Sequence, residues 1–199
     1  MTDRLVLAST SQIRQTLLRN AAVPFDICPV RIDEITIRDS MLAEAATPRD
    51  IADALAEQKA RRGSQKRPDA LVLGCDQVLD FNGRILSKPA SPQEARAHLE
   101  ALNGQKHQLL SAAVLYRNAE PVWRHTGVVR LTMRQASPAY LDDYVARNWD
   151  SIRQSVGGYK LEEEGVRLFH RIEGDYFTVL GLPLLELLSY LTLKGTIPG

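Results

Sequence analysis

The strongest candidate for chemistry is Asp76, which comes directly after the apolar residues 70–75. That run predicts a buried strand, and open α/β sheets bind ligands at the carboxyl ends of such strands. A carboxylate there can hold a divalent cation or accept a proton from an attacking water. From these residues alone, a turn aspartate at the strand end is an equally good interpretation. Asp80 lies four residues further on, so the Asp-x-Asp pair of aspartyl-phosphate chemistry is absent.

A second candidate is the hydroxyl-rich turn Ser9-Thr10-Ser11, followed by Arg14. Backbone amides at the start of a helix, flanked by hydroxyls, suit an anionic oxygen. A guanidinium about one turn further on matches the geometry of phosphate. Taken alone, these serines are more readily explained as helix caps.

Two lysines and a glutamate complete the set. Lys88 follows a predicted hairpin and can reach a phosphate as a mobile point charge. Lys59 falls on a predicted helix, and we expect it on a different face from Ile51 and Leu55. Glu34 is a second candidate ligand for a metal or a water. Each of these three, taken singly, is more readily explained as an ordinary surface residue.

The composition narrows the classes of partner. The chain has 199 residues, with 25 basic and 24 acidic side chains, and its formal net charge is +1. Such a balance provides no global field to hold nucleic acid or an anionic membrane, so neither is expected as a partner. An anionic ligand must therefore be bound by a local cluster of cations.

Cysteine and histidine usage points away from disulfide and zinc frameworks. Cys28 and Cys75 lie far apart and form no CxxC pair, and the four histidines show no metal-ligand spacing. The apolar stretch near the N-terminus is too short for a secretion signal, and no segment reaches the length of a membrane span. We therefore expect a cytoplasmic protein.

The elements that must position these residues alternate between strand and helix. Thr47-Pro48 and Ser91-Pro92 are helix starts, and Asn82-Gly83 is a hairpin signal. The pattern predicts an α/β fold with an extended mixed sheet flanked by helices. The segment 157–165 predicts a flexible polar loop, and 174–183 is a second glycine-bounded segment before the last helix; loops of this kind can read a base. Strands are predicted at 5–8, 25–28, 70–75, 107–133 with a turn near Asn118, and 167–172; helices are predicted at 13–21, 47–62, 91–102, from Ser137 onward, and at 184–193.

Taken in order, these segments resemble the Maf family of nucleoside triphosphate pyrophosphatases, and the match runs nearly end to end. Each piece is weak alone, but the ordered set is highly specific. The matching pieces are Leu7-Ala8-Ser9-Thr10-Ser11 with Arg14, Val30 to Glu34, Ala56 to Ala60, Gly74-Cys75-Asp76-Gln77-Val78, Lys88-Pro89, Leu102-Asn103-Gly104, Gly158-Tyr159, Gly174-Asp175-Tyr176 and Gly181-Leu182-Pro183-Leu184.

The resemblance implies a single Maf-like domain over residues 1–199, with two lobes and a nucleotide-binding cleft. It implies cleavage of non-standard or surplus nucleoside triphosphates to monophosphate and diphosphate, assisted by Mg²⁺ or Mn²⁺, and it leaves a homodimer open. By position, Asp76 is the catalytic carboxylate and base, and Glu34 shares the metal or water with it. The expected phosphate-binding set is Ser9, Ser11, Arg14, Lys59 and Lys88.

The sequence departs from the common family pattern at three places. Ile13 stands where the family usually has a further arginine, and Gln77 stands where it usually has threonine. Glu162 replaces a glutamine of the late loop, and we expect it to bind the base. A carboxylate suits the N1 and N2 donors of guanine, and a methylated, cationic base better still. These departures favour the 7-methyl-GTP pyrophosphatase-like branch.

Two other functions remain open at this point. One is a non-catalytic nucleotide-binding protein that acts in cell-division control, as the family name suggests. The complete set of Arg14, Lys59, Asp76 and Lys88 argues against it, because binding alone does not need a positioned carboxylate base. The other is a phosphatase that releases single phosphates, which product identity would distinguish.

Overall fold

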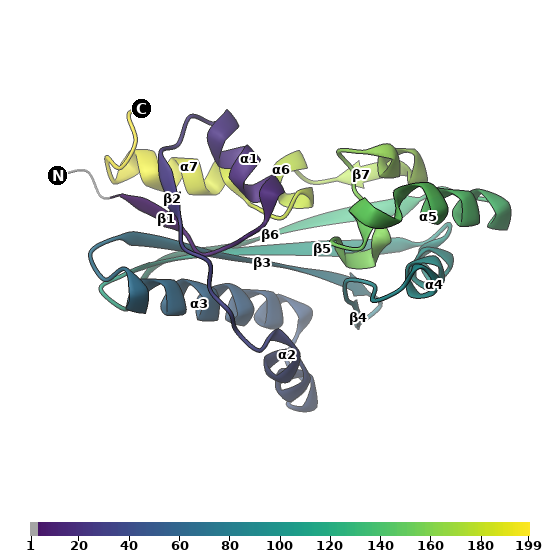
Figure 1. The fold of residues 1–199 in the computed structure, drawn as a ribbon, viewed down its shortest axis with the longest axis horizontal. Helices are drawn as coiled ribbons and strands as arrows, with labels where there is room; N and C mark the ends of the chain where they lie inside the picture. Colours follow the sequence, from purple (N-terminus) through teal and green to yellow (C-terminus); the bar gives the residue numbers. More distant parts are fainter. Residues whose placement is uncertain (1–3) are drawn as a thin grey trace.

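A long, seven-stranded mixed sheet forms the centre of the computed structural model, which describes residues 4–199 (Figure 1). Its strands follow the order β2-β1-β3-β5-β6-β7, and β4 pairs with the far end of β3. The strands are β1 (Leu5–Leu7), β2 (Phe25–Ile27), β3 (Leu71–Phe81), β4 (Arg84–Leu86), β5 (Lys106–Arg117), β6 (Glu120–Met133) and β7 (Phe169–Glu173).

Only the first part of the sheet is parallel. β1 pairs in parallel with both β2 and β3, whereas β3, β5, β6 and β7 form antiparallel pairs. The helices are α1 (Gln12–Asn20), α2 (Glu34–Ala43), α3 (Pro48–Lys66), α4 (Pro92–Leu102), α5 (Pro138–Ile152), α6 (Tyr176–Val179) and α7 (Leu184–Leu193), with 3₁₀ turns η1 (Val156–Gly158) and η2 (Glu164–Leu168).

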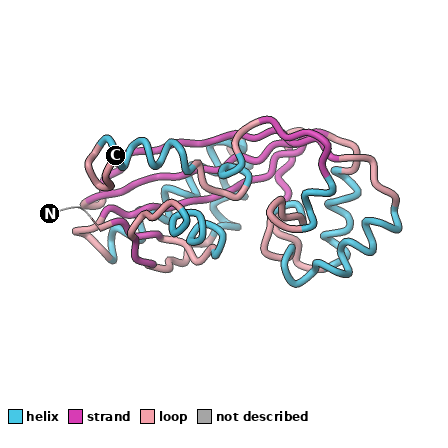
Figure 2. The backbone as a smooth tube through the Cα atoms, turned by 90° about the horizontal axis from the view of Figure 1, so that it is seen from above, coloured by secondary structure: helices cyan, strands magenta, loops and turns pink. Residues whose placement is uncertain are grey.

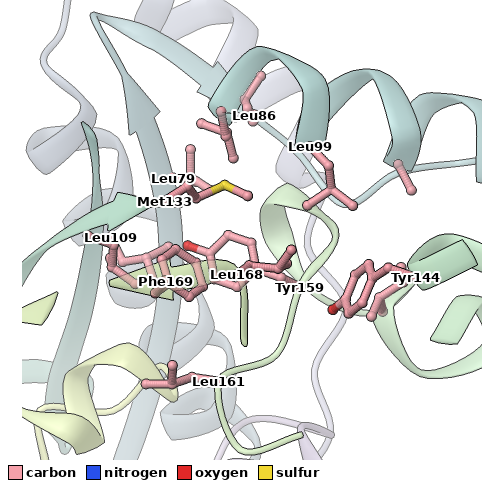
Figure 3. Packing of buried hydrophobic residues seen from close by; sticks show 14 of the residues in the cluster. Leu79, Leu86, Leu99, Leu109, Met133, Tyr144, Tyr159, Leu161, Leu168 and Phe169 are labelled. Carbon is pink, nitrogen blue, oxygen red and sulfur yellow. The ribbon is translucent and has the colours of Figure 1, made fainter. Parts of the chain in front are cut away.

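The long strands connect two lobes (Figure 2). In the first lobe, α3 packs on one face of the sheet while α1 and α7 cover the other. The second lobe has its own apolar core, built from the far ends of β3, β5 and β6 together with α4, α5 and the 3₁₀ turns. Figure 3 shows this core around Tyr159, Phe169 and Met133.

Local signals in the sequence explain most of the elements. Thr47 caps α3 through a reciprocal capping box with Asp50, and Ser91 caps α4 by accepting from the Glu94 amide. Asn82 and Gly83 both have positive φ in the turn between β3 and β4. The predicted mixed sheet, its hairpin and these helices are therefore confirmed.

Three predictions about elements were incomplete or wrong. Helix α2 has no predicted counterpart, and none of its residues is buried. Strand β7 begins at Phe169 rather than Arg167, because residues 164–168 form a 3₁₀ turn. The segment 157–165 is not a flexible polar loop, since Gly157, Gly158, Tyr159 and Gly165 are buried. Within residues 4–199, no helix is long and apolar enough to cross a membrane.

Helix α3 lies unusually close to the sheet at Gly74. A Cβ atom there would clash with the backbone of Ala56 and Ala60, so only glycine allows this approach. Side chains two residues apart on a strand share a face, so Asp76 points toward α3 as well. The close approach thus fixes the distance between Asp76 and the residues of α3.

Candidate active site

The site begins where the parallel part of the sheet ends. β1 stops at Leu7, opposite Leu73, and β4 pairs only with Leu79–Phe81. Between these points, β3 has no strand on that side within residues 4–199. The Arg14 guanidinium fills part of the gap, donating from Nη1 to the Cys75 carbonyl at 3.1 Å and from Nε to the Gly181 carbonyl at 2.7 Å. The sheet edge therefore holds a buried, fixed positive charge.

Asp76, Lys59 and Glu34 form a connected cluster beside this gap. Lys59 Nζ lies 2.5 Å from Asp76 Oδ1 and 2.7 Å from Glu34 Oε1. The Lys59 and Asp76 side chains are only 12% and 11% exposed, whereas that of Glu34 is 49% exposed. One ammonium group therefore bridges a buried carboxylate and a half-exposed one.

Two positions within this cluster differ from the sequence-based expectation. Asp76 does not follow its strand but lies inside it, opposite Ala112 of β5, because β3 continues to Phe81. Lys59 does not face away from Ile51 and Leu55. Residues spaced by four lie along one side of a helix, so Lys59 lies on the same side of α3 as Ile51 and Leu55. From there its side chain reaches the cavity at the sheet.

Burial and charge set the proton affinities of this cluster. Burial raises the pKa of Asp76, and the charges of Lys59 and Arg14 offset only part of that rise. Burial lowers the pKa of Lys59, but Asp76 and Glu34 outweigh it and hold the pKa above its usual value. Burial also raises the pKa of Glu34, but Lys59, Lys88 and Arg14 reverse this and leave the pKa below its ordinary range. Lys59 is thus held as a cation beside a carboxylate of increased basicity.

These groups open into a cavity of about 590 Å³ between the lobes. That volume lies within the range of typical small-molecule sites. Ser9 is not in the wall, but its hydroxyl accepts from the Ser11 amide at 3.2 Å and lies 3.5 Å from Arg14 Nη1. The predicted site residues that do line the cavity are Ser11, Arg14, Glu34, Lys59, Asp76, Lys88 and Glu162.

The second lobe supplies the far wall of the cavity. Leu109, Val156, Tyr159 and Leu161 give it an apolar surface, and Glu162 stands at its rim. The Tyr159 hydroxyl lies 2.7 Å from His107 Nε2, and its ring packs edge-on against Phe169. The segment before Glu162 is therefore anchored in the core (Figure 3). Burial raises the pKa of Glu162.

Two carboxylates of the cavity, Glu34 and Asp76, could hold a metal ion. Residues 4–199 contain no group of three His, Cys, Asp or Glu side chains arranged to hold an ion. Glu34 and Asp76 both accept from Lys59 Nζ, so their carboxylates lie close together in the cavity, and an ion would bind beside the ammonium group through their other oxygens. Mg²⁺ is usually bound by one or two carboxylates together with substrate phosphates and waters, so this pair fits such an ion.

Two further residues near the cluster, Gln77 and Arg38, were not predicted from the sequence as site residues. The Gln77 amide donates to Ser111 Oγ and to the carbonyls of Thr178 and Val179. It thereby ties β3 to the turn that carries the Gly181 carbonyl. Arg38, in the wall of the cavity, lies four residues after Glu34. That spacing would have indicated Arg38 if α2 had been predicted.

Comparisons with known proteins identify the family of the chain. The sequence matches the family described as Maf-like protein over residues 4–193. It is 65% identical over 197 residues to a nucleoside triphosphate pyrophosphatase of Ruegeria pomeroyi, covering 99% of each chain. It is 44% identical to a 7-methyl-GTP pyrophosphatase of Mesorhizobium japonicum, covering 100% of both chains.

Among solved structures, a HAM1 protein from Coxiella burnetii shares the fold, with a TM-score of 0.52 at 18% identity. The alignment covers 96% of this chain and 99% of that one. The family match and the relatives extend over nearly the whole sequence, including every residue of the cluster. The chain belongs to the Maf family.

Proposed function

We propose that this protein is a nucleoside triphosphate pyrophosphatase, a hydrolase that cleaves a nucleoside triphosphate into a monophosphate and diphosphate. The observation that carries the proposal is the bridge from Lys59 to Asp76 and Glu34, at one end of a cavity that also holds Arg14 and Lys88. The full-length similarity to relatives with this activity in their names supports it.

In the proposed reaction, a water oxygen bonds to the α-phosphorus and the bond from that phosphorus to the β-phosphate oxygen breaks. Asp76 takes the proton from the water, and diphosphate leaves with the electron pair of the broken bond. A buried carboxylate of raised pKa is a stronger base than an exposed one, which suits this role. Lys59 keeps the carboxylate oriented through its 2.5 Å contact.

The cations of the cavity have a separate task. Arg14 is fixed by two backbone carbonyls and offers its remaining N–H groups to phosphate oxygens, whereas the exposed Lys88 acts as a mobile charge. Ser9 and Ser11 support Arg14 and the turn before α1. Glu34 and Asp76 would hold Mg²⁺ or Mn²⁺, which when bound supplies charge neutralisation for the leaving diphosphate.

For the base, we propose a guanine-type purine, with 7-methyl-GTP as the first compound to test. Glu162 stands at the apolar far wall, where its carboxylate can accept from the N1 and N2 donors of guanine. The Mesorhizobium japonicum relative bears this substrate in its name. A competition assay among 7-methyl-GTP, GTP, dTTP and UTP tests the choice; a preference for a pyrimidine would reject it.

The test of the reaction is Asp76→Asn, which keeps the size of the side chain and removes the base. We expect normal folding and a loss of diphosphate release on the order of 10²-fold or more. Asp80→Asn is the matched control, because it makes the same substitution in the same strand at the hairpin. Turnover by Asp76→Asn close to that of the wild-type protein would reject the assignment.

A further inference from the structure

Helix α2 brings a second ionisable side chain to the cavity besides Glu34. Arg38 lies four residues after Glu34, and residues at this spacing lie on the same side of a helix. Both side chains line the cavity. Arg38 therefore belongs to the same wall as the carboxylate that contacts Lys59.

The partners of Arg38 leave most of its guanidinium available. Nη1 donates to the Ser87 hydroxyl at 2.7 Å, and Nε donates to Asp39 Oδ1 at 3.1 Å. The Asp39 side chain is 60% exposed, so water screens this ion pair strongly. The other N–H groups have no protein acceptor in the hydrogen-bond network of residues 4–199. A guanidinium has five such donors in a fixed plane, an arrangement that matches phosphate oxygens.

The position of Ser87 shows where this guanidinium lies. Ser87 follows β4 and directly precedes Lys88, and its carbonyl accepts from the Gly157 amide at 3.4 Å. The contact from Arg38 therefore joins α2 to the segment of the cavity wall that carries Lys88. The group that holds Arg38 there is a neutral hydroxyl. A phosphate oxygen can replace this hydroxyl as the acceptor at small cost, because the serine can then form a hydrogen bond with water instead.

The charge of the site favours a further cation. Besides Arg38, the charged side chains that line the cavity balance one another, with four cations (Arg14, Lys59, Lys88, Lys160) and four carboxylates (Glu34, Asp76, Glu94, Glu162). A triphosphate carries several negative charges, and a divalent ion neutralises only part of them. A leaving diphosphate needs its developing charge to be stabilised, and an arginine side chain is well suited to this.

We propose that Arg38 is a further substrate-binding residue that contacts the diphosphate portion of the nucleotide, and that Ser87 holds it in place before substrate binds. The inference rests on the proposed pyrophosphatase function. Its specific content is that a residue of α2, outside the set expected from the family resemblance, binds the leaving group.

The experiment compares Arg38→Ala, Arg38→Lys and Ser87→Ala with the wild-type protein. It measures KM and kcat with 7-methyl-GTP or GTP and Mg²⁺, and the affinities for diphosphate and for the nucleoside monophosphate by calorimetry. For Arg38→Ala we expect about a tenfold weaker affinity for diphosphate and a similar rise in KM, since one charge-assisted hydrogen-bonding group is lost. We expect an unchanged affinity for the monophosphate and an intermediate effect for Arg38→Lys. For Ser87→Ala we expect a smaller loss of diphosphate affinity than for Arg38→Ala, because the arginine keeps its charge but is no longer held in place.

Three results would overturn the inference. One is an unchanged affinity of Arg38→Ala for diphosphate. Another is an equal loss of affinity for monophosphate and diphosphate, which would indicate general damage to the cavity. The third is a Ser87→Ala variant that reproduces the full effect, since Arg38 would then act by positioning the segment before Lys88. If the wild-type protein releases no diphosphate from any nucleotide, the proposed function fails, while the binding comparison still decides the role of Arg38.

Discussion

Replacement of Lys59 by methionine tests how much the contact between Lys59 and Asp76 contributes to the free energy of unfolding. The change removes the ammonium group but keeps most of the apolar stem, so it isolates the charge. Lys59 is the only side chain within residues 4–199 that donates a hydrogen bond to the Asp76 carboxylate, and both side chains are about nine-tenths buried. The variant therefore leaves a buried carboxylate without its partner.

The size of the effect follows from that burial. Removing one partner of a buried ion pair costs about 3–5 kcal/mol, because the remaining charge is desolvated and uncompensated. Arg14 still lies near Asp76, and the cavity admits water, so we expect a loss near the lower end, about 3 kcal/mol. Lys88→Met is the matched control. Lys88 is exposed in the same cavity, and we expect its replacement to cost less than about 1 kcal/mol.

The assay is urea unfolding at several pH values. Without Lys59, the charge and hydrogen bond that lower the pKa of Asp76 are lost, so this pKa rises further. The penalty is therefore full above that pKa and disappears as the pH falls and the carboxyl takes a proton. A Lys59→Met/Asp76→Asn double variant should recover much of the lost stability at neutral pH. A cost of Lys59→Met no greater than that of Lys88→Met, or one that does not depend on pH, would contradict the role of Lys59 as the partner of a buried charge.

Three further predictions concern the surroundings of the site. Gly74→Ala should force α3 away from β3, lowering the melting temperature and diphosphate release together, because the new Cβ meets the backbone of α3; unchanged activity would contradict the role of that contact. Burial lowers the pKa of His107 to about 4, so the folded protein should lose about 3 kcal/mol of stability as the pH falls from 6.5 toward 4, a slope that His107→Gln should remove in urea titrations. Burial raises the pKa of the Cys75 thiol to about 11, so a thiol reagent at pH 8 should modify only the half-buried Cys28 in the native protein and both thiols in urea.

Local signals account for the elements that could be predicted from sequence. The capping residues Thr47 and Ser91 and the turn Asn82-Gly83 act through their own neighbours, so their structures follow from short segments. Helix α2 was not predicted. Its apolar residues are only partly buried against the rest of the protein, so the helical spacing of apolar residues is weak in this segment.

The arrangement of the site depends on contacts far apart in the sequence. The polar residues Asp76 and Gln77 interrupt an apolar strand pattern, and only the pairing of β3 with β5 shows that the strand continues through them. The contact of Lys59 with Asp76 depends on how closely α3 approaches Gly74, which no local pattern encodes. The family resemblance predicted that these residues belong to the site. Only the structure shows that Lys59 contacts both Asp76 and Glu34, and at what distances.

In the proposed reaction, water attacks the α-phosphorus and diphosphate leaves. The most direct measurement is hydrolysis of 7-methyl-GTP or GTP in oxygen-18 water with Mg²⁺, followed by mass spectrometry of both products. We predict one labelled oxygen in the nucleoside monophosphate and none in the diphosphate. Label in the diphosphate, or release of single inorganic phosphate, would contradict it.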